Sequence, residues 1–103
     1  MNTQQLIDNV RSWGEDKGIT GTGGKATVVS QLLKLLEEVE EIQQAIKTND
    51  IEELADGIGD STVVLILLAE RAGLKYEDCL QGAYDIISKR TGKMVDGTFV
   101  KDK

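Results

Sequence analysis

The chain contains no proline, and its apolar residues recur at helical rather than strand spacing. Proline interrupts helices more strongly than any other residue, and a half-buried strand needs apolar residues at every second position. Between about residues 26 and 47, apolar side chains return every three or four positions and form one continuous stripe. The sequence therefore predicts an all-α fold.

Four helices are predicted from this periodicity and from residues that favour helix ends. Gly18 ends the first helix and begins a glycine-rich loop. Asn49 or Asp50 is a natural N-cap for the third helix, and Gly73 is a stop signal beyond its end. The predicted helices cover about residues 3–17, 26–47, 51–72 and 76–90.

A short tail follows the fourth helix, over residues 92–103. It contains Asp96-Gly97 between two apolar pairs, which is a hairpin-turn signal and predicts a small ribbon or an extended flap. With 103 residues, the length indicates one domain, 1–103, whose core helices lie at about 26–91. A chain this short buries only about two thirds of its surface when it folds alone, so we expect it to oligomerise.

The composition indicates in which cellular compartment the protein is expected. Cys79 is the only cysteine and has no partner for an internal disulfide, which is typical of a reducing cytoplasm. The longest apolar run, Val63 to Ala69, is seven residues, whereas a membrane span needs about 20. No basic start precedes an apolar run at the N-terminus, so no signal peptide is predicted. We expect a cytoplasmic protein.

Charge and residue content restrict the chemistry further. The 18 acidic and 12 basic residues give a net charge of −6, which argues against binding to a nucleic-acid polymer. The absence of histidine excludes Ser-His-Asp and Cys-His catalysis and every imidazole metal site. Thiolate zinc sites are excluded by the single cysteine. Any metal is therefore held by oxygen ligands, which suits Mg²⁺ or Mn²⁺.

The second predicted helix carries an acidic group at 37–41. At about 100° per residue, Glu38 lies at the edge of the apolar stripe, and Glu41 follows on the same flank. Lys34 shares that flank, whereas Glu37 and Glu40 point toward solvent. An acidic run on a helix is often a solvated face, but the position of Glu38 and Glu41 beside the core favours a site.

The third predicted helix carries Glu53, Asp56 and Asp60 within one arc of about 60°. The same side continues into the apolar residues Val63, Val64 and Leu67, while the opposite side carries a second apolar face formed by Ile51, Leu54, Ala55, Ile58, Leu65 and Ala69. Helices that are apolar all round are normally surrounded by protein, so we expect this helix to be buried on both sides. For Glu53, a capping box with Asp50 is an equal alternative to metal binding.

Bringing these acidic groups together predicts a cation. Two carboxylates about 6 Å apart repel by nearly 3 kcal/mol at an effective dielectric of about 20. Lys34 is the only nearby basic residue that the helical pattern places on this side. Mg²⁺ is the natural compensation because it prefers hard oxygen ligands and usually bridges protein carboxylates to substrate phosphates.

The segment from Lys34 to Ile42, K-L-L-E-E-V-E-E-I, resembles the K-L-x-E-E-x-x-E-L segment of MazG-like nucleotide pyrophosphohydrolases. These proteins belong to the all-α NTP pyrophosphatase superfamily, whose signature is E-x-x-E, an interval, and then E-x-x-D. The stretch 38–41 matches the first half, and 53–56 can match the second. Gly59-Asp60 also resembles the family's G-D, although Gly57 stands where the family usually has glutamate.

The C-terminal sequence adds to this resemblance. Residues 90–101 read R-T-G-K-M-V-D-G-T-F-V-K, similar to the R-x-G-K-M-x-x-G-x-F-V-K tail of a short MazG-like subgroup found in phages and Gram-positive bacteria. The resemblance implies a four-helix MazG-like bundle that forms homodimers or homotetramers. It also implies Mg²⁺-dependent hydrolysis of (deoxy)nucleoside triphosphates to the monophosphate and pyrophosphate by a metal-activated water, with Mn²⁺ as a substitute.

The resemblance also implies roles for particular residues. Glu38 and Glu41 are the expected catalytic residues, and the expected metal ligands are Glu38, Glu41, Glu53, Asp56 and Asp60. The residues expected to bind substrate are Lys34, Lys89, Arg90, Lys93 and Trp13. The three basic residues after position 88 have an alternative role in stabilising a helix C-terminus, and Trp13 has an alternative role in core packing.

Two other functions compete with this one. A helical binding or regulatory module that retains the fold without activity is the main alternative. A di-iron carboxylate bundle is disfavoured because it pairs its glutamates with Glu-x-x-His motifs, and this chain has no histidine. The preferred base and sugar do not follow from the sequence.

Overall fold

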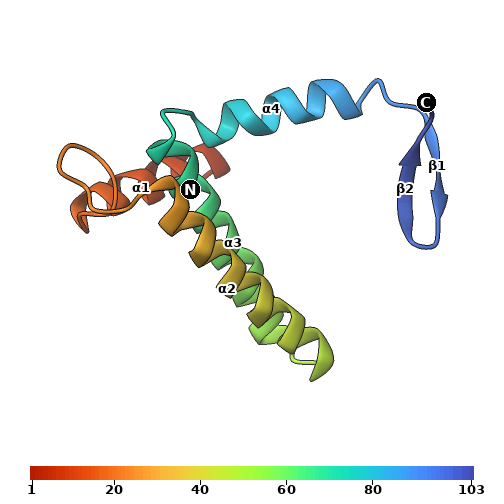
Figure 1. The fold of residues 1–103 in the computed structure, drawn as a ribbon, viewed down its shortest axis with the longest axis horizontal. Coiled ribbons are helices and arrows are strands. Elements are labelled where there is room, and N and C mark those ends of the chain that lie inside the picture. Colours follow the sequence, from red (N-terminus) through yellow and green to blue (C-terminus); the bar gives the residue numbers. More distant parts are fainter.

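The computed structural model describes all residues, 1–103, and contains four helices followed by a two-stranded hairpin (Figure 1). This confirms the predicted all-α class with a C-terminal hairpin. No helix combines the length and the apolar character that crossing a bilayer requires. The elements are α1 (Thr3–Asp16), α2 (Val28–Lys47), α3 (Ile51–Arg71), α4 (Tyr76–Ile87), β1 (Gly92–Val95) and β2 (Thr98–Lys101).

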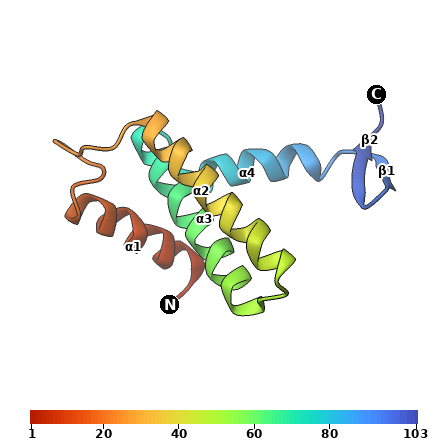
Figure 2. The same cartoon turned by 60° about the horizontal axis from the view of Figure 1, so that its bottom comes forward.

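The centre of the fold is an antiparallel pair formed by α2 and α3, which lie side by side along most of their length (Figures 1 and 2). Thr27 caps α2 and shares a capping box with Ser30. Of the two predicted caps for α3, Asp50 fills the role, since its side chain accepts a hydrogen bond from the Glu53 N–H at 3.1 Å. The short turn between the helices sets the antiparallel arrangement.

A glycine permits the close approach of α2 and α3. A Cβ atom added at Gly57 would lie 2.7 Å from Cγ1 of Ile42, which is closer than real side chains tolerate. Gly57 is buried in the helix pair. The glycine at this position is therefore explained by helix packing.

The small core surrounds the second half of α3, where α1 packs across it. Four side chains of α3 are buried there, and Ile7 and Ala45 are the buried apolar residues of α1 and α2. In the first half of α3, Gly57 alone is buried. The prediction that α3 is buried on both sides thus holds for its second half, while Ile51 and Ile58 remain 73% and 56% exposed in the single chain. The buried side chains of α3 are Val64, Ile66, Leu67 and Ala69.

The last quarter of the chain leaves the helix pair. The helix α4 touches α3 and α1 near its start and then runs outward, and the hairpin lies beyond its end without contacting any helix (Figure 1). The hairpin turn is the predicted Asp96-Gly97, with positive φ angles of 49° and 83° at the two residues. The strands pair with Gly92 opposite Lys101 and Val95 opposite Thr98.

Candidate metal centre

Three carboxylates converge between α2 and α3. Glu38 and Glu41 lie on the same side of α2 because they are three residues apart, and α3 places Asp60 opposite them. One carboxylate oxygen from each of the three residues lies within 4.8 Å of the other two. Glu38 is buried, whereas Glu41 and Asp60 are exposed. The cluster is therefore anchored in protein on one side and open on the other.

Glu38 is the buried member of this cluster. It is 5% exposed, and its Oε2 atom has no hydrogen-bond partner. Burial raises the pKa of Glu38, and the adjacent Glu41 and Asp60 raise it further. The nearest basic group is Lys34, whose Nζ lies 3.8 Å from Oε1 of Glu38 and 3.3 Å from Oε2 of Glu37.

These features fit a divalent cation. A buried carboxylate oxygen without a partner is costly, and two further carboxylates beside it add repulsion. The donor atoms are all carboxylate oxygens, which Mg²⁺ and Mn²⁺ prefer. Open space beside the exposed Glu41 and Asp60 leaves room for water or substrate in the remaining coordination positions.

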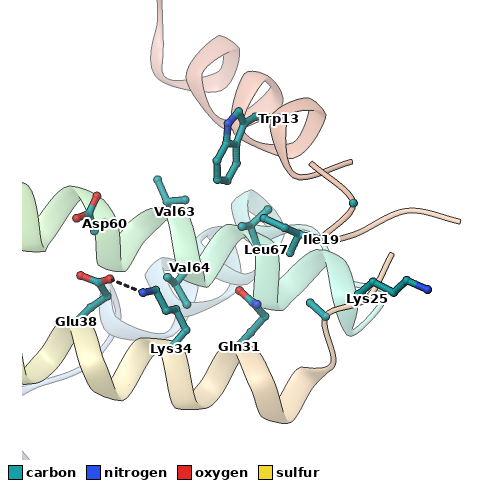
Figure 3. A pocket seen from close by; sticks show the side chains of 12 residues that line it. Trp13, Ile19, Lys25, Gln31, Lys34, Glu38, Asp60, Val63, Val64 and Leu67 are labelled. Carbon is teal, nitrogen blue, oxygen red and sulfur yellow. Dashed lines mark ion pairs between the residues drawn. The ribbon is translucent and has the colours of Figure 1, made fainter. Parts of the chain in front are cut away.

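A cavity of about 610 Å³ adjoins the cluster (Figure 3). Its volume lies within the usual range for small-molecule sites. Glu38 and Asp60 stand at one end, and Val63, Val64 and Leu67 form an apolar wall that leads away from them. The other lining residues are Trp13, Gly18, Ile19, Lys25, Ala26, Gln31 and Lys34.

Trp13 belongs to the wall of this cavity. Its side chain comes from α1 and points toward Val63 and Leu67, and the residue is 46% exposed (Figure 3). The indole is thus placed where a flat ligand could stack on it, rather than being enclosed by the core. Gln31 and Ile19 are among the lining residues that the sequence did not predict as part of the site. Gln31 shares the flank of α2 that carries Lys34, so the helical pattern contained a signal for it, whereas Ile19 lies in the glycine-rich loop.

The remaining residues predicted for the site are not brought into the cluster. Glu53 and Asp56 are exposed on α3 and lie outside the group of three converging carboxylates. Three predicted phosphate-binding residues lie beyond α4 and are exposed without an ion pair, far along the segment that leaves the helix pair: Lys89, Arg90 and Lys93. The single chain therefore unites Lys34, Trp13 and three of the five predicted metal ligands.

Comparisons with known proteins agree with the resemblance. The chain is 35% identical over 68 residues to the "uncharacterized 18.2 kDa protein in rep-hol intergenic region" of Haemophilus phage HP1. That match covers 66% of this chain and 40% of the phage protein, so the chain spans well under half of the relative's length. No solved structure matches the chain.

A family model described as the MazG nucleotide pyrophosphohydrolase domain matches residues 26–95. The matched range includes α2, α3, α4 and β1. It also includes the three clustered carboxylates. The chain therefore belongs to the MazG nucleotide pyrophosphohydrolase domain family.

Proposed function

We propose that this protein hydrolyses nucleoside or deoxynucleoside triphosphates to the monophosphate and pyrophosphate, with Mg²⁺ or Mn²⁺ as cofactor. The observation that carries the proposal is the buried, unpartnered Oε2 of Glu38 among converging carboxylates at the mouth of a cavity of about 610 Å³. Membership of the MazG family supports the same reaction.

The proposed metal ligands are Glu38, Glu41 and Asp60. Asp56 precedes Asp60 by four residues, one helical turn, and is the nearest further carboxylate on that face of α3. Glu53 is displaced from Asp60 by about 10 Å along the helix axis, and its N–H is bound by Asp50 at the helix start. We therefore favour Asp56 over Glu53 as an additional ligand.

Glu38, Glu41 and Asp60 would hold a divalent cation here, and that cation would supply Lewis-acid chemistry by neutralising phosphate charge and activating water. Glu41 is exposed beside Glu38, so its free carboxylate oxygen is placed to accept the proton of the attacking water. Lys34 points to the same end of the cavity and neutralises phosphate charge (Figure 3). At the other end, Trp13 stacks on the base against the apolar wall.

The active form is proposed to be a homodimer or homotetramer. Many large apolar side chains stay about half exposed in the single chain, including Leu32, Leu36 and Val39 on α2. Exposed apolar surface of this extent marks an interaction site. We also infer a cytoplasmic location, since Cys79 is exposed and unpaired.

The direct test is pyrophosphate release from a panel of NTPs and dNTPs, with Mg²⁺ or with EDTA. We expect release with Mg²⁺ alone, and its loss in Glu38→Gln and Asp60→Asn. Glu37→Gln is the matched control, because Glu37 is adjacent in the sequence but its side chain is 65% exposed and outside the cluster. Release of neither pyrophosphate nor phosphate from any nucleotide would refute the proposal.

The alternative is a binding or regulatory module without activity. It is favoured by Gly57, which occupies the position where the family pattern usually has a glutamate. A protein of this kind would still melt at a higher temperature with Mg²⁺ or with a nucleotide, but would show no turnover. Thermal denaturation measured beside the activity panel separates the two functions.

A further inference from the structure

One wall of the cavity comes from a segment that the family model does not cover. The family match begins at residue 26, whereas Trp13 and Ile19 also line the cavity. Trp13 is carried by α1, and its side chain points toward Val63 and Leu67 on α3 (Figure 3). The helix α1 packs against α3 and α4 but not against α2. The width of the cavity therefore depends on how α1 is placed on α3.

Apolar contacts give α1 only a small anchor. Ile7 and Gly14 are its buried residues, while Leu6 and Trp13 are about half exposed. Gly14 allows a close approach of α1 to α3, because a Cβ atom added there would lie 2.5 Å from Cδ2 of Leu67. Packing stability grows with the apolar area that is buried, and one isoleucine buries little. A further contact is needed to fix the orientation of α1 about the contact at Gly14.

Arg11 supplies that further contact. Its guanidinium donates a hydrogen bond to Oε1 of Glu77 at 2.8 Å and another to Oε2 of Glu77, so two bonds join α1 to the first turn of α4. The Nε atom of Arg11 lies 3.8 Å from Oε2 of Glu70 on α3. A two-pronged pair of arginine and carboxylate fixes direction as well as distance. One side chain thus connects α1 to both of the helices on which it packs.

The pair of Arg11 and Glu77 is sheltered and ionised. The side chains of Arg11 and Glu77 are 15% and 24% exposed. Hydrogen bonds from Arg11 lower the pKa of Glu77 to about 2, and hydrogen bonds from the backbone N–H of Glu77 and from Gln4 add to this effect. Ion pairs that lie fully in solvent contribute little, whereas sheltered, charged hydrogen bonds contribute more. The pair therefore orients α1 over the whole neutral pH range.

Arg11 acts from outside the cavity. It is not a lining residue, and it precedes Trp13 by two positions, which places the two side chains about 200° apart around the helix. Arg11 faces α4, while Trp13 faces the cavity. A helix moves as a rigid body, so a tilt of α1 about the contact between Gly14 and Leu67 moves the ring of Trp13. The three converging carboxylates lie on α2 and α3 alone, and they stay in place.

We propose that Arg11 is a positioning residue for the nucleotide. Through Glu77 it fixes α1 on α3, and it thereby sets the gap between Trp13 and the apolar wall of Val63 and Leu67 that holds the base. Losing Arg11 should weaken binding of the nucleotide without slowing the reaction at the carboxylate cluster. The identity of the ligand rests on the proposed function, whereas the placement of α1 by Arg11 does not.

The placement of α1 is tested by the fluorescence of Trp13, which is the only tryptophan of the chain. Arg11→Met removes the guanidinium but keeps a long apolar side chain. Its Trp13 emission should shift to longer wavelength and be quenched more strongly by acrylamide, at a temperature where circular dichroism shows the helix content of wild type. If folded Arg11→Met keeps the emission and quenching of wild type, the proposal is overturned.

Two further variants support this measurement. Lys17→Met is the matched control, because Lys17 is exposed at the end of α1 and forms no ion pair, and its emission should match wild type. Arg11→Lys replaces Arg11→Met if the latter does not fold. It keeps the charge but not the two-pronged hydrogen bond, so it should show the same shift, and a wild-type spectrum would again count against the proposal.

Steady-state kinetics test the consequence for the nucleotide that wild type hydrolyses best. Arg11→Met should raise KM about fivefold, because base stacking is weakened rather than lost, and should change kcat by less than about twofold. Since Arg11 acts through Trp13, adding Arg11→Met to Trp13→Ala should raise KM by less than about twofold more.

Three kinetic results would overturn the positioning role of Arg11. They are an unchanged KM in Arg11→Met, a kcat that falls as far as KM rises, and effects of Arg11→Met and Trp13→Ala on KM that multiply. If wild type neither binds nor hydrolyses any nucleotide, the proposed function fails, and the fluorescence of Trp13 still decides whether Arg11 places α1.

Discussion

Substituting Glu38 by glutamine should make the metal-free protein more stable and abolish its response to Mg²⁺. The cluster places one oxygen each of Glu38, Glu41 and Asp60 within 4.8 Å of one another. At that separation, two carboxylates repel by about 3.5 kcal/mol at an effective dielectric of 20. Glu38 takes part in two of the three repulsions, and its unpartnered oxygen is buried. A glutamine amide removes the charge and can donate hydrogen bonds to the two remaining carboxylates.

The net gain is smaller than the summed repulsion, because Glu41 and Asp60 are exposed and screened by water and salt. Losing the contact between Lys34 and Glu38 reduces this gain in stability by less than about 1 kcal/mol, since the lysine is exposed. We expect a gain of about 1–3 kcal/mol, which for a domain of this size raises Tm by about 5–15 °C. Wild type should gain about 2.7 kcal/mol in Mg²⁺ at one hundred times its Kd, while the variant gains nothing.

The sign of the pH dependence follows from the raised pKa of Glu38. A carboxyl group whose pKa is raised by folding destabilises the protein as pH rises from its ordinary pKa through the folded-state value. Metal-free wild type should therefore lose stability over that interval, and Glu38→Gln should lose less. Thermal melts monitored by circular dichroism in EDTA, at a series of pH values from about 4 to 8, measure the pH dependence. Melts in EDTA and in Mg²⁺ at pH 8 measure the metal response, with Glu37→Gln as control in both. A Glu38→Gln protein that melts below wild type in EDTA would refute the electrostatic argument.

Three further predictions concern other parts of the fold. Gly57→Ala should lower Tm, because the added methyl group would meet Cγ1 of Ile42 at 2.7 Å. At Gly59 an added Cβ has no atom within 4 Å, so Gly59→Ala should stabilise the protein by up to about 1 kcal/mol. Equal melting temperatures of the two variants by calorimetry would contradict this. Glu77→Gln should lower Tm at neutral pH. Because the pKa of Glu77 is lowered to about 2, the difference from wild type should persist above its ordinary pKa and vanish as pH falls through about 2; a difference that is constant with pH would disprove the role of this pair. Trp13→Ala should raise KM for the preferred nucleotide about tenfold with a smaller effect on kcat, as loss of base stacking does, and an unchanged KM in steady-state assays would place the base elsewhere.

The helices could be predicted because their ends carry strong local signals. The helix α3 begins and ends within one residue of the bounds that Asp50 and Gly73 predict, and the hairpin turns at the predicted Asp96-Gly97. The fourth helix ends at Ile87, three residues before the predicted end, where its apolar pattern stops. Ser88 then caps the helix, and the N–H groups of the next two residues bond carbonyls only three positions back. Lys89 and Arg90 thus lie outside the helix, where they are less well placed to stabilise its dipole.

Two of the three converging carboxylates, Glu38 and Glu41, lie on α2, and their positions could be predicted from that helix alone. The position of Glu38 at the edge of the apolar stripe already predicted a partly buried carboxylate, and the structure buries it to 5% exposure. Which carboxylates of α3 would join it depended on how far one helix is shifted along the other. That shift is set by the contact between Gly57 and Ile42, which no single-helix pattern contains. The exposure of Ile51 and Ile58 likewise could not be predicted from the helix alone, because it depends on where the other elements of the chain pack.

The glycine at position 57 also affects the charge of the site. It lets α2 approach α3 closely, and the resulting cluster holds three carboxylates instead of the four of the family pattern. One divalent cation together with Lys34 balances three negative charges. With Asp56 as a further ligand, the site keeps a net negative charge before a nucleotide binds, and the chain has no further cation in contact with the cluster for the phosphates. If the proposed reaction takes place, the remaining positive charge for the phosphates must come from groups that lie outside the cluster in this structure.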